Sequence, residues 1–283
     1  MKKILFTVLV IAACQVMLAG PIVVTQTTNL VALANALGGG GGLTITSVQI
    51  LNGADSQFGT YTGFTGVANG VVMSTGQVVQ TTPAFHSSGN SPSTDTGKTG
   101  TAEFNAYGPG HITNFSNSND VAALLVNFTL SSPSQVGFDF VFGSVEYPVY
   151  TSQYTDAFLA FLDGTGAANQ IAFDAGGKAV QVGASFASAL TTSDTNTAFY
   201  NPHGLFKLTT FTQGQLAAGP HTLIFEVGDV NDHILDSAVF ISGLHAGAGQ
   251  GGTNPTVPEP STLALMGLGI ATLAGLRWRK RAN

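Results

Sequence analysis

Residues 136–142 read Val-Gly-Phe-Asp-Phe-Val-Phe, and every second position of this stretch carries a large apolar side chain. A period of two is the spacing of side chains that face the same side of a β-strand. The stretch therefore predicts a strand that buries four side chains in an apolar core: Val136, Phe138, Phe140 and Phe142. Phenylalanines at this spacing pack a core far more often than they form a ligand platform, so we interpret them as packing residues.

Further strands are predicted on both sides of this stretch. They share short apolar or alternating runs bounded by turn-forming residues, and they cover residues 43–50, 70–76, 121–130, 157–162, 222–227 and 237–241. Asp163-Gly164 predicts a hairpin turn, with residues 170–173 as the returning strand. Many short strands at similar spacing favour an all-β fold, specifically a β-sandwich of the jelly-roll type.

The segments outside these strands give one short N-terminal helix, one joint and one long loop. Thr28 or Asn29 can cap a helix over residues 30–37, which place their leucines on one face. The five glycines at 38–42 predict a flexible joint after this helix. Residues 83–119 are rich in Ser, Asn, Gly and Pro and predict a long surface loop of the kind that carries function.

The charge is unevenly distributed along the chain. Residues 21–256 contain 14 acidic residues against three lysines, a net charge of −11. A body this acidic argues against nucleic acid and anionic membranes as partners, and it suits divalent cations. Cys14 is the only cysteine and lies in the N-terminal segment. The body therefore has no disulfide and must depend on its apolar core for stability.

Both ends of the chain carry an apolar run flanked by basic residues. Residues 1–20 predict a Sec signal peptide, because two lysines are followed by an apolar run and small residues. A Gly-rich linker over residues 246–257 leads to a tail over residues 258–283, in which a transmembrane helix is predicted at 261–278. The tail combines an uncharged run with a Pro-Glu-Pro triplet before it and a basic cluster after it: Pro258, Glu259, Pro260, Arg277, Arg279, Lys280 and Arg281. The basic cluster would hold that end in the cytoplasm and leave the body outside.

This tail resembles the PEP-CTERM sorting signal of Gram-negative bacteria. The resemblance implies recognition by an exosortase, a membrane protease-transpeptidase that removes the helix. It also implies an intermediate anchored in the inner membrane, delivery to the cell surface or extracellular matrix, and a link to exopolysaccharide or biofilm. The alternative is an ordinary single-pass anchor that is never cut.

Two acidic segments lie where predicted strands meet loops. Residues 142–158 contain Glu146 and Asp156. Residues 228–240 contain Asp229, Asp232 and Asp236. Loop carboxylates without basic partners are ligands that Ca²⁺ prefers, so these five residues are the candidate calcium ligands and Ca²⁺ is the expected cofactor. The alternative is that the same acids cap turns or satisfy buried amide groups.

An EF-hand loop does not fit the second of these segments. His233 stands where an EF-hand would need an acid, so a calcium site would have to be assembled from separate loops.

The same segments resemble the choice-of-anchor L domain, an extracellular module of bacterial surface proteins. The more specific match is a closing motif formed by Asp229, Asp232, Ile234, Leu235, Asp236, Ser237, Val239 and Phe240. An earlier motif is matched by Ser144, Glu146, Tyr147 and Pro148, with Val145 where an acid is common and Thr155 where Asn is common. The resemblance covers roughly residues 28–244 and implies a surface module without an assigned activity.

No enzyme motif is present in the sequence, including the serine-hydrolase elbow, the zinc-protease helix and the phosphate-binding loop. The six histidines are scattered and are interpreted as loop residues: His86, His111, His203, His221, His233 and His245. We therefore expect a non-catalytic structural or adhesive protein. The alternative is a lectin that binds surface glycans through residues 83–119, or a glycoside hydrolase that uses two carboxylates such as Glu146 and Asp236.

Overall fold

The computed structural model describes residues 21–64, 67–87, 89–212 and 214–247. The predicted signal peptide at 1–20, nearly all of the predicted linker and the whole sorting tail lie outside this part of the chain. Among the residues that are described, no helix has both the length and the apolar character needed to cross a membrane.

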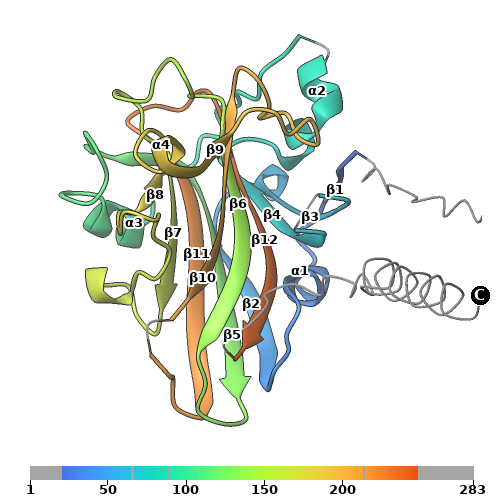
Figure 1. The fold of residues 1–283 in the computed structure, drawn as a ribbon, viewed down its shortest axis with the longest axis vertical. Helices are drawn as coiled ribbons and strands as arrows, with labels where there is room; N and C mark the ends of the chain where they lie inside the picture. The colour runs from blue at the N-terminus through green and yellow to red at the C-terminus, as the bar shows by residue number, and fades with distance from the viewer. Residues whose placement is uncertain (1–20, 65–66, 88, 213, 248–283) are drawn as a thin grey trace, which may run out of the picture.

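Two antiparallel sheets make up the domain (Figure 1). The first has seven strands in the order β1 (Val23–Gln26), β3 (Phe58–Thr62), β4 (Asn69–Ser74), β12 (Ser237–Ala246), β6 (Val136–Ser144), β10 (Gly204–Phe211) and β9 (Leu190–Thr191). The second has five strands in the order β2 (Leu43–Asn52), β5 (Ser118–Leu130), β11 (Gly219–Val230), β7 (Ala157–Leu162) and β8 (Val180–Gln181).

The strand order confirms the predicted β-sandwich. Eight of the strands follow the jelly-roll scheme, in which the chain passes repeatedly from one sheet to the other. Their order is β4-β12-β6-β10 in one sheet and β5-β11-β7-β8 in the other. Strands β1 and β3 extend the first sheet beyond β4, β9 extends it beyond β10, and β2 extends the second sheet beyond β5.

The core confirms the role predicted for the phenylalanines of β6. Phe138, Phe140 and Phe142 are fully buried in the largest apolar cluster. The ring of Phe138 lies 5.0 Å from that of Phe225 in β11, and the ring of Phe140 lies 4.9 Å from that of Phe158 in β7. Because β6 belongs to one sheet and β7 and β11 to the other, these contacts join the two sheets across the sandwich.

The predicted helix is α1 (Leu30–Leu37). The Asn29 side chain accepts hydrogen bonds from the backbone amides of Val31 and Ala32 at 3.1 and 3.0 Å, which makes Asn29 its N-cap. Three shorter helices and three 3₁₀ turns were not predicted: α2 (Pro83–Ser87), α3 (Ala102–Tyr107), α4 (Phe186–Ala189), η1 (Asp55–Gln57), η2 (Val78–Thr81) and η3 (Ala167–Asn169). They contain too few turns for an apolar period to be visible in the sequence.

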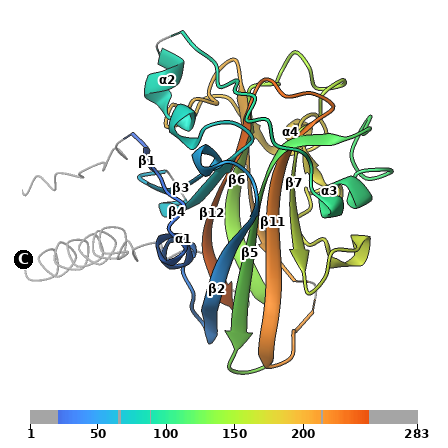
Figure 2. The same cartoon turned by 180° about the vertical axis from the view of Figure 1, so that it is seen from behind.

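The prediction that residues 83–119 form a surface loop is wrong in part. Helix α3 buries Phe104 and Tyr107 on the outer face of the five-stranded sheet, in a cluster with Val121 and Leu159. Figure 2 shows α3 beside this sheet. The segment is therefore partly a covering layer, because two aromatic side chains are enough to dock so short a helix.

The prediction of a flexible joint at residues 38–42 is also wrong. The Gly40 carbonyl accepts hydrogen bonds from the amides of Leu43 and Ala246 at 3.1 and 2.9 Å. Gly41 has φ +64°, and a Cβ there would lie 1.9 Å from the Ala246 carbonyl oxygen. The glycines thus permit a tight turn that packs against β12. Ala246, the first residue of the predicted linker, is the last residue of that strand.

The predicted hairpin at residues 163–164 forms only a short return. Asp163 and Gly164 both have positive φ, as a tight turn requires. The returning segment makes a single bridge between Phe161 and Gln170 instead of a strand.

Candidate metal centre

All five predicted calcium ligands lie near the end of β6 or β11 or near the start of β7 or β12, and these strand ends meet at one end of the sandwich, the upper end in Figures 1 and 2. The pairing registers bring the end of β6 beside the start of β12, and the end of β11 beside the starts of β5 and β7. Glu146 follows β6, Asp156 precedes β7, and Asp229 lies in the last residues of β11. Asp232 and Asp236 lie in the connection from β11 to β12. Paired strands are antiparallel, so the end of one strand lies beside the start of its neighbour. Acids from residues 146–156 and from residues 229–236, about 80 residues later in the chain, therefore lie at the same end of the sandwich.

Three of the five predicted ligands converge. Glu146, Asp156 and Asp232 each offer one carboxylate oxygen, and these oxygens lie within 4.8 Å of one another. Oxygens bound to opposite sides of one Ca²⁺ are about 5 Å apart, and neighbouring ones about 3 Å. The three residues, which we call the first group, therefore have the spacing that a single cation requires.

The residues of the first group differ in how they are held. Asp156 is fully buried, and its two oxygens accept hydrogen bonds from the Val230 amide at 3.0 Å and the Ser237 hydroxyl at 2.7 Å. Glu146 is also fully buried, but no described residue donates a hydrogen bond to either of its oxygens. A buried carboxylate without a donor is unfavourable unless it is neutralised or coordinates a cation.

Asp229 lies beside the first group. It is fully buried, and no described residue donates a hydrogen bond to its oxygens. The Thr75 hydroxyl lies close enough to offset part of the rise that burial causes in the pKa of Asp229, and it donates a hydrogen bond to the Ser237 carbonyl oxygen at 3.4 Å. Asp229 therefore adds a second buried carboxyl group next to Asp156.

Asp236 is a second acidic neighbour of Asp229, because, in addition to burial, the charges of both Asp156 and Asp236 raise the pKa of Asp229. It is fully buried; its Oδ1 accepts a hydrogen bond from the Thr94 amide at 2.7 Å, while its Oδ2 has no donor among the described residues. Asp229 and Asp236 thus lie outside the group whose oxygens converge, although charge interactions with Asp156 connect Asp229, and through it Asp236, to that group.

Burial and mutual repulsion raise the pKa values throughout this region. Burial, with the charges of Asp156 and Asp232 added to it, raises the pKa of Glu146 to about 11. Burial likewise raises the pKa values of Asp156 and Asp236 to about 7, and it raises those of Asp229 and Asp232 above their ordinary range. Every ion pair among the described residues involves a histidine, so no lysine or arginine there compensates these charges.

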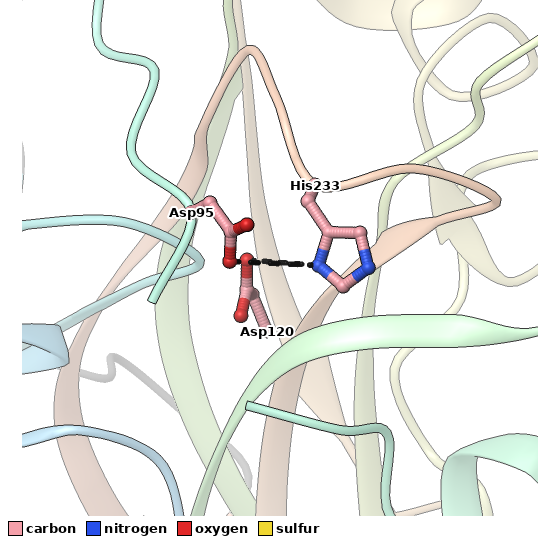
Figure 3. Close-up of side chains that lie close together, drawn as sticks. All are labelled: Asp95, Asp120 and His233. Carbon is pink, nitrogen blue, oxygen red and sulfur yellow. Dashed lines mark hydrogen bonds and ion pairs between the residues drawn. The ribbon is translucent and has the colours of Figure 1, made fainter. Parts of the chain in front are cut away.

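A second group was not predicted from the sequence. Asp95, Asp120 and His233 also place one ligand atom each within 4.8 Å of the others, and Figure 3 shows the three side chains facing one another. His233 was interpreted only as a loop residue, and Asp95 and Asp120 are isolated acids in a polar segment. The available signal was that Asp120 directly precedes a predicted strand, as Asp156 does.

A comparison with protein-family models assigns most of the chain. The model described as the choice-of-anchor L domain matches residues 23–245. The chain belongs to this family. The model described as the PEP-CTERM protein-sorting motif matches residues 256–281, which marks this choice-of-anchor L protein as an exported surface protein processed by an exosortase.

Two further comparisons add little to this assignment. No curated protein matches this choice-of-anchor L protein. Among solved structures, one match is a CBM28 carbohydrate-binding module specific for non-crystalline cellulose, with 16% identity over 48% of this chain and 77% of that chain. Its TM-score of 0.23 is too low to support an argument about fold or ligand.

This choice-of-anchor L domain differs from the family motif at two positions, Val145 and Thr155, and both side chains are buried. Val145, where an acid is common, is 4% exposed and belongs to an apolar cluster with Phe199 and Leu205. Thr155 is buried, and its hydroxyl donates a hydrogen bond to the Thr113 carbonyl oxygen at 2.6 Å. The Val145 side chain therefore packs in an apolar cluster. Having valine at this position, where an acid is common, leaves the three carboxylates of the first group in place.

Proposed function

We propose that this choice-of-anchor L protein is a non-catalytic structural or adhesive component of the surface or extracellular matrix of a Gram-negative bacterium. It would leave the cytoplasm by the Sec pathway, pass through an inner-membrane-anchored intermediate and be released from its tail by an exosortase. The observation that carries this proposal is the order of the two family matches, a choice-of-anchor L domain at 23–245 followed by a sorting motif at 256–281. Exopolysaccharide or another surface glycan is the partner class that this destination favours.

The proposal includes Ca²⁺ as the cofactor of the folded domain. Glu146, Asp156 and Asp232 supply hard oxygen ligands from three separate segments, which suits a cation that takes six to eight oxygens in flexible geometry. The buried oxygens of Glu146, which lack a hydrogen-bond donor among the described residues, support this assignment. The ion would connect the end of β6, the start of β7 and the β11–β12 connection, so its role would be structural.

Burial supports a non-catalytic role for these acids. Glu146 and Asp236, the pair considered for glycoside hydrolysis, are both 0% exposed. A general acid or nucleophile must reach the glycosidic bond, and a carboxyl group covered by protein on all sides cannot do so without rearrangement.

The sorting step is tested by the substitution Glu259→Ala in the Pro-Glu-Pro triplet. We expect most of the variant chain to remain as a precursor in the inner-membrane fraction, because the exosortase would no longer recognise the tail. Membrane fractionation followed by immunoblotting measures the ratio of precursor to mature protein. Ser261→Ala, next to the triplet, is the matched control and should mature normally. Normal maturation of Glu259→Ala would contradict the sorting step.

A further inference from the structure

We propose that Asp95, Asp120 and His233 form a second metal site, selective for a borderline divalent cation of the Zn²⁺ type and separate from the calcium site. This inference goes beyond the proposed function, because it concerns a different set of ligands and a different class of metal.

The spacing of the second group differs from that of an ordinary His–Asp hydrogen bond. His221 and Asp163 form such a pair in the same domain, with Nδ1 2.7 Å from the carboxylate oxygen. In contrast, His233 Nδ1 lies 3.4 Å from Asp120 Oδ2 and 3.8 Å from Asp95 Oδ1. Two ligand atoms on a tetrahedral Zn²⁺ lie roughly 3.3–3.6 Å apart, given metal–ligand distances of about 2.0–2.2 Å. The distance from His233 to Asp120 therefore falls in this range, the distance to Asp95 is slightly longer, and all three ligand atoms lie within 4.8 Å of one another.

Asp120 is held in the orientation that a metal ligand needs. It is fully buried, and its Oδ1 accepts hydrogen bonds from the Thr96 hydroxyl at 2.6 Å and the Lys98 amide at 2.8 Å. Its Oδ2 accepts a hydrogen bond from the Thr96 amide at 3.2 Å and faces His233 Nδ1 at 3.4 Å. Outer hydrogen bonds of this kind fix the carboxylate, and the second lone pair of Oδ2 remains directed to the position of a cation beside His233.

An independent observation beside the second group concerns the Oδ2 atom of Asp236. Asp236 is fully buried, this oxygen has no hydrogen-bond donor among the described residues, and the carboxylate lies close enough to Asp120 for that charge to raise its pKa. A cation bound by the first group would leave Asp120 and Asp236 as two adjacent buried acids. A second cation would compensate that charge.

The donor set determines the class of metal. One imidazole nitrogen with two carboxylate oxygens suits Zn²⁺, whereas Ca²⁺ prefers oxygen ligands alone. His233 is 44% exposed and Asp95 is 62% exposed at their side chains, so a metal can enter from solvent and retain a water ligand.

The two sites would act on the same connection between β11 and β12. Asp232 belongs to the first group and the next residue, His233, to the second. With both sites filled, the connection would be fixed from two sides, to the starts of β5 and β7 and the end of β6.

The test is a Zn²⁺ titration of the untagged full chain, purified in detergent and freed of metal with a chelator. Calorimetry and elemental analysis should give one Zn²⁺ per chain. His233→Ala and Asp95→Asn should each weaken binding by at least about tenfold, since even outer-shell changes commonly weaken metal sites by 10–100-fold. Asp95→Asn changes an exposed side chain, so it keeps the test valid if His233→Ala fails to fold.

Two controls separate this site from the calcium site. His221→Ala removes the other His–Asp pair and should leave Zn²⁺ binding unchanged, and Glu146→Gln should also leave it unchanged. The proposal is overturned if the wild-type chain binds no Zn²⁺, if both second-group variants bind it as the wild type does, or if Glu146→Gln abolishes the binding.

Discussion

Adding millimolar Ca²⁺ to the chelator-treated protein should raise its melting temperature by about 5–10 °C. A ligand that binds only the folded state at 100 times its Kd contributes about 2.7 kcal/mol, and for a domain of this size each kcal/mol corresponds to roughly 2–4 °C. The increase is expected because Glu146 and Asp229 are buried without hydrogen-bond donors among the described residues, next to Asp156. Differential scanning calorimetry in calcium and in chelator measures it.

Glu146→Gln should remove most of this response. The substitution keeps the shape of the side chain and removes one of the three converging carboxylates. Asp163→Asn is the matched control, because Asp163 pairs with His221 away from the acidic end and should leave the calcium response intact. An equal response in wild type and Glu146→Gln would place the ion elsewhere, and the absence of any response in the wild type would remove Ca²⁺ from the proposed function.

Glu226→Gln should stabilise the domain at neutral pH by about 3 kcal/mol. Glu226 lies in β11, is fully buried, and belongs to neither metal group. Burial raises its pKa to about 8, and the charge of Glu103 acts in the same direction. The folded state thus retains a proton that the unfolded chain loses near its ordinary pKa of 4.5, so the wild-type domain loses stability between about pH 4.5 and pH 8. Glutamine is neutral throughout this range and escapes the loss.

Urea unfolding at pH 5 and pH 8, in saturating Ca²⁺, measures this effect. The gain from Glu226→Gln should be small at pH 5 and near its maximum at pH 8. Asp55→Asn, which changes an exposed acid, should show no such dependence. A gain of equal size at both pH values would mean that the substitution acts through packing instead of charge.

Several features of this domain could be predicted because the residues that determine them are adjacent in sequence. The alternating phenylalanines of β6 and the short apolar runs on either side were sufficient to predict the β-sandwich, because burial of every second side chain is a local property of a strand. The capped helix α1 was predictable for the same reason, since Asn29 and the leucines of residues 30–37 are neighbours in sequence. The sorting motif is likewise contiguous, and its family match agrees with the residues that predicted it.

The local pattern failed where a segment is stabilised by distant parts of the chain. Five consecutive glycines indicate flexibility in isolation, but residues 38–42 form a turn whose hydrogen bonds end on β12, about 200 residues later. Helix α3 was hidden in a polar segment because its two buried aromatic side chains dock on strands that are distant in sequence, among them β7, where Phe161 contacts Tyr107.

The amino-acid sequence by itself determined the fold class, the C-terminal sorting motif and which acids stand at strand ends. Only the tertiary structure decided how those acids are grouped: Glu146, Asp156 and Asp232 converge, Asp229 and Asp236 lie beside them, and Asp95 and Asp120 meet His233. The physical reason is that antiparallel strands from two sheets bring their ends together at one end of the sandwich. Distances between carboxylates there depend on register and sheet packing, and the spacing of residues along the chain contains neither.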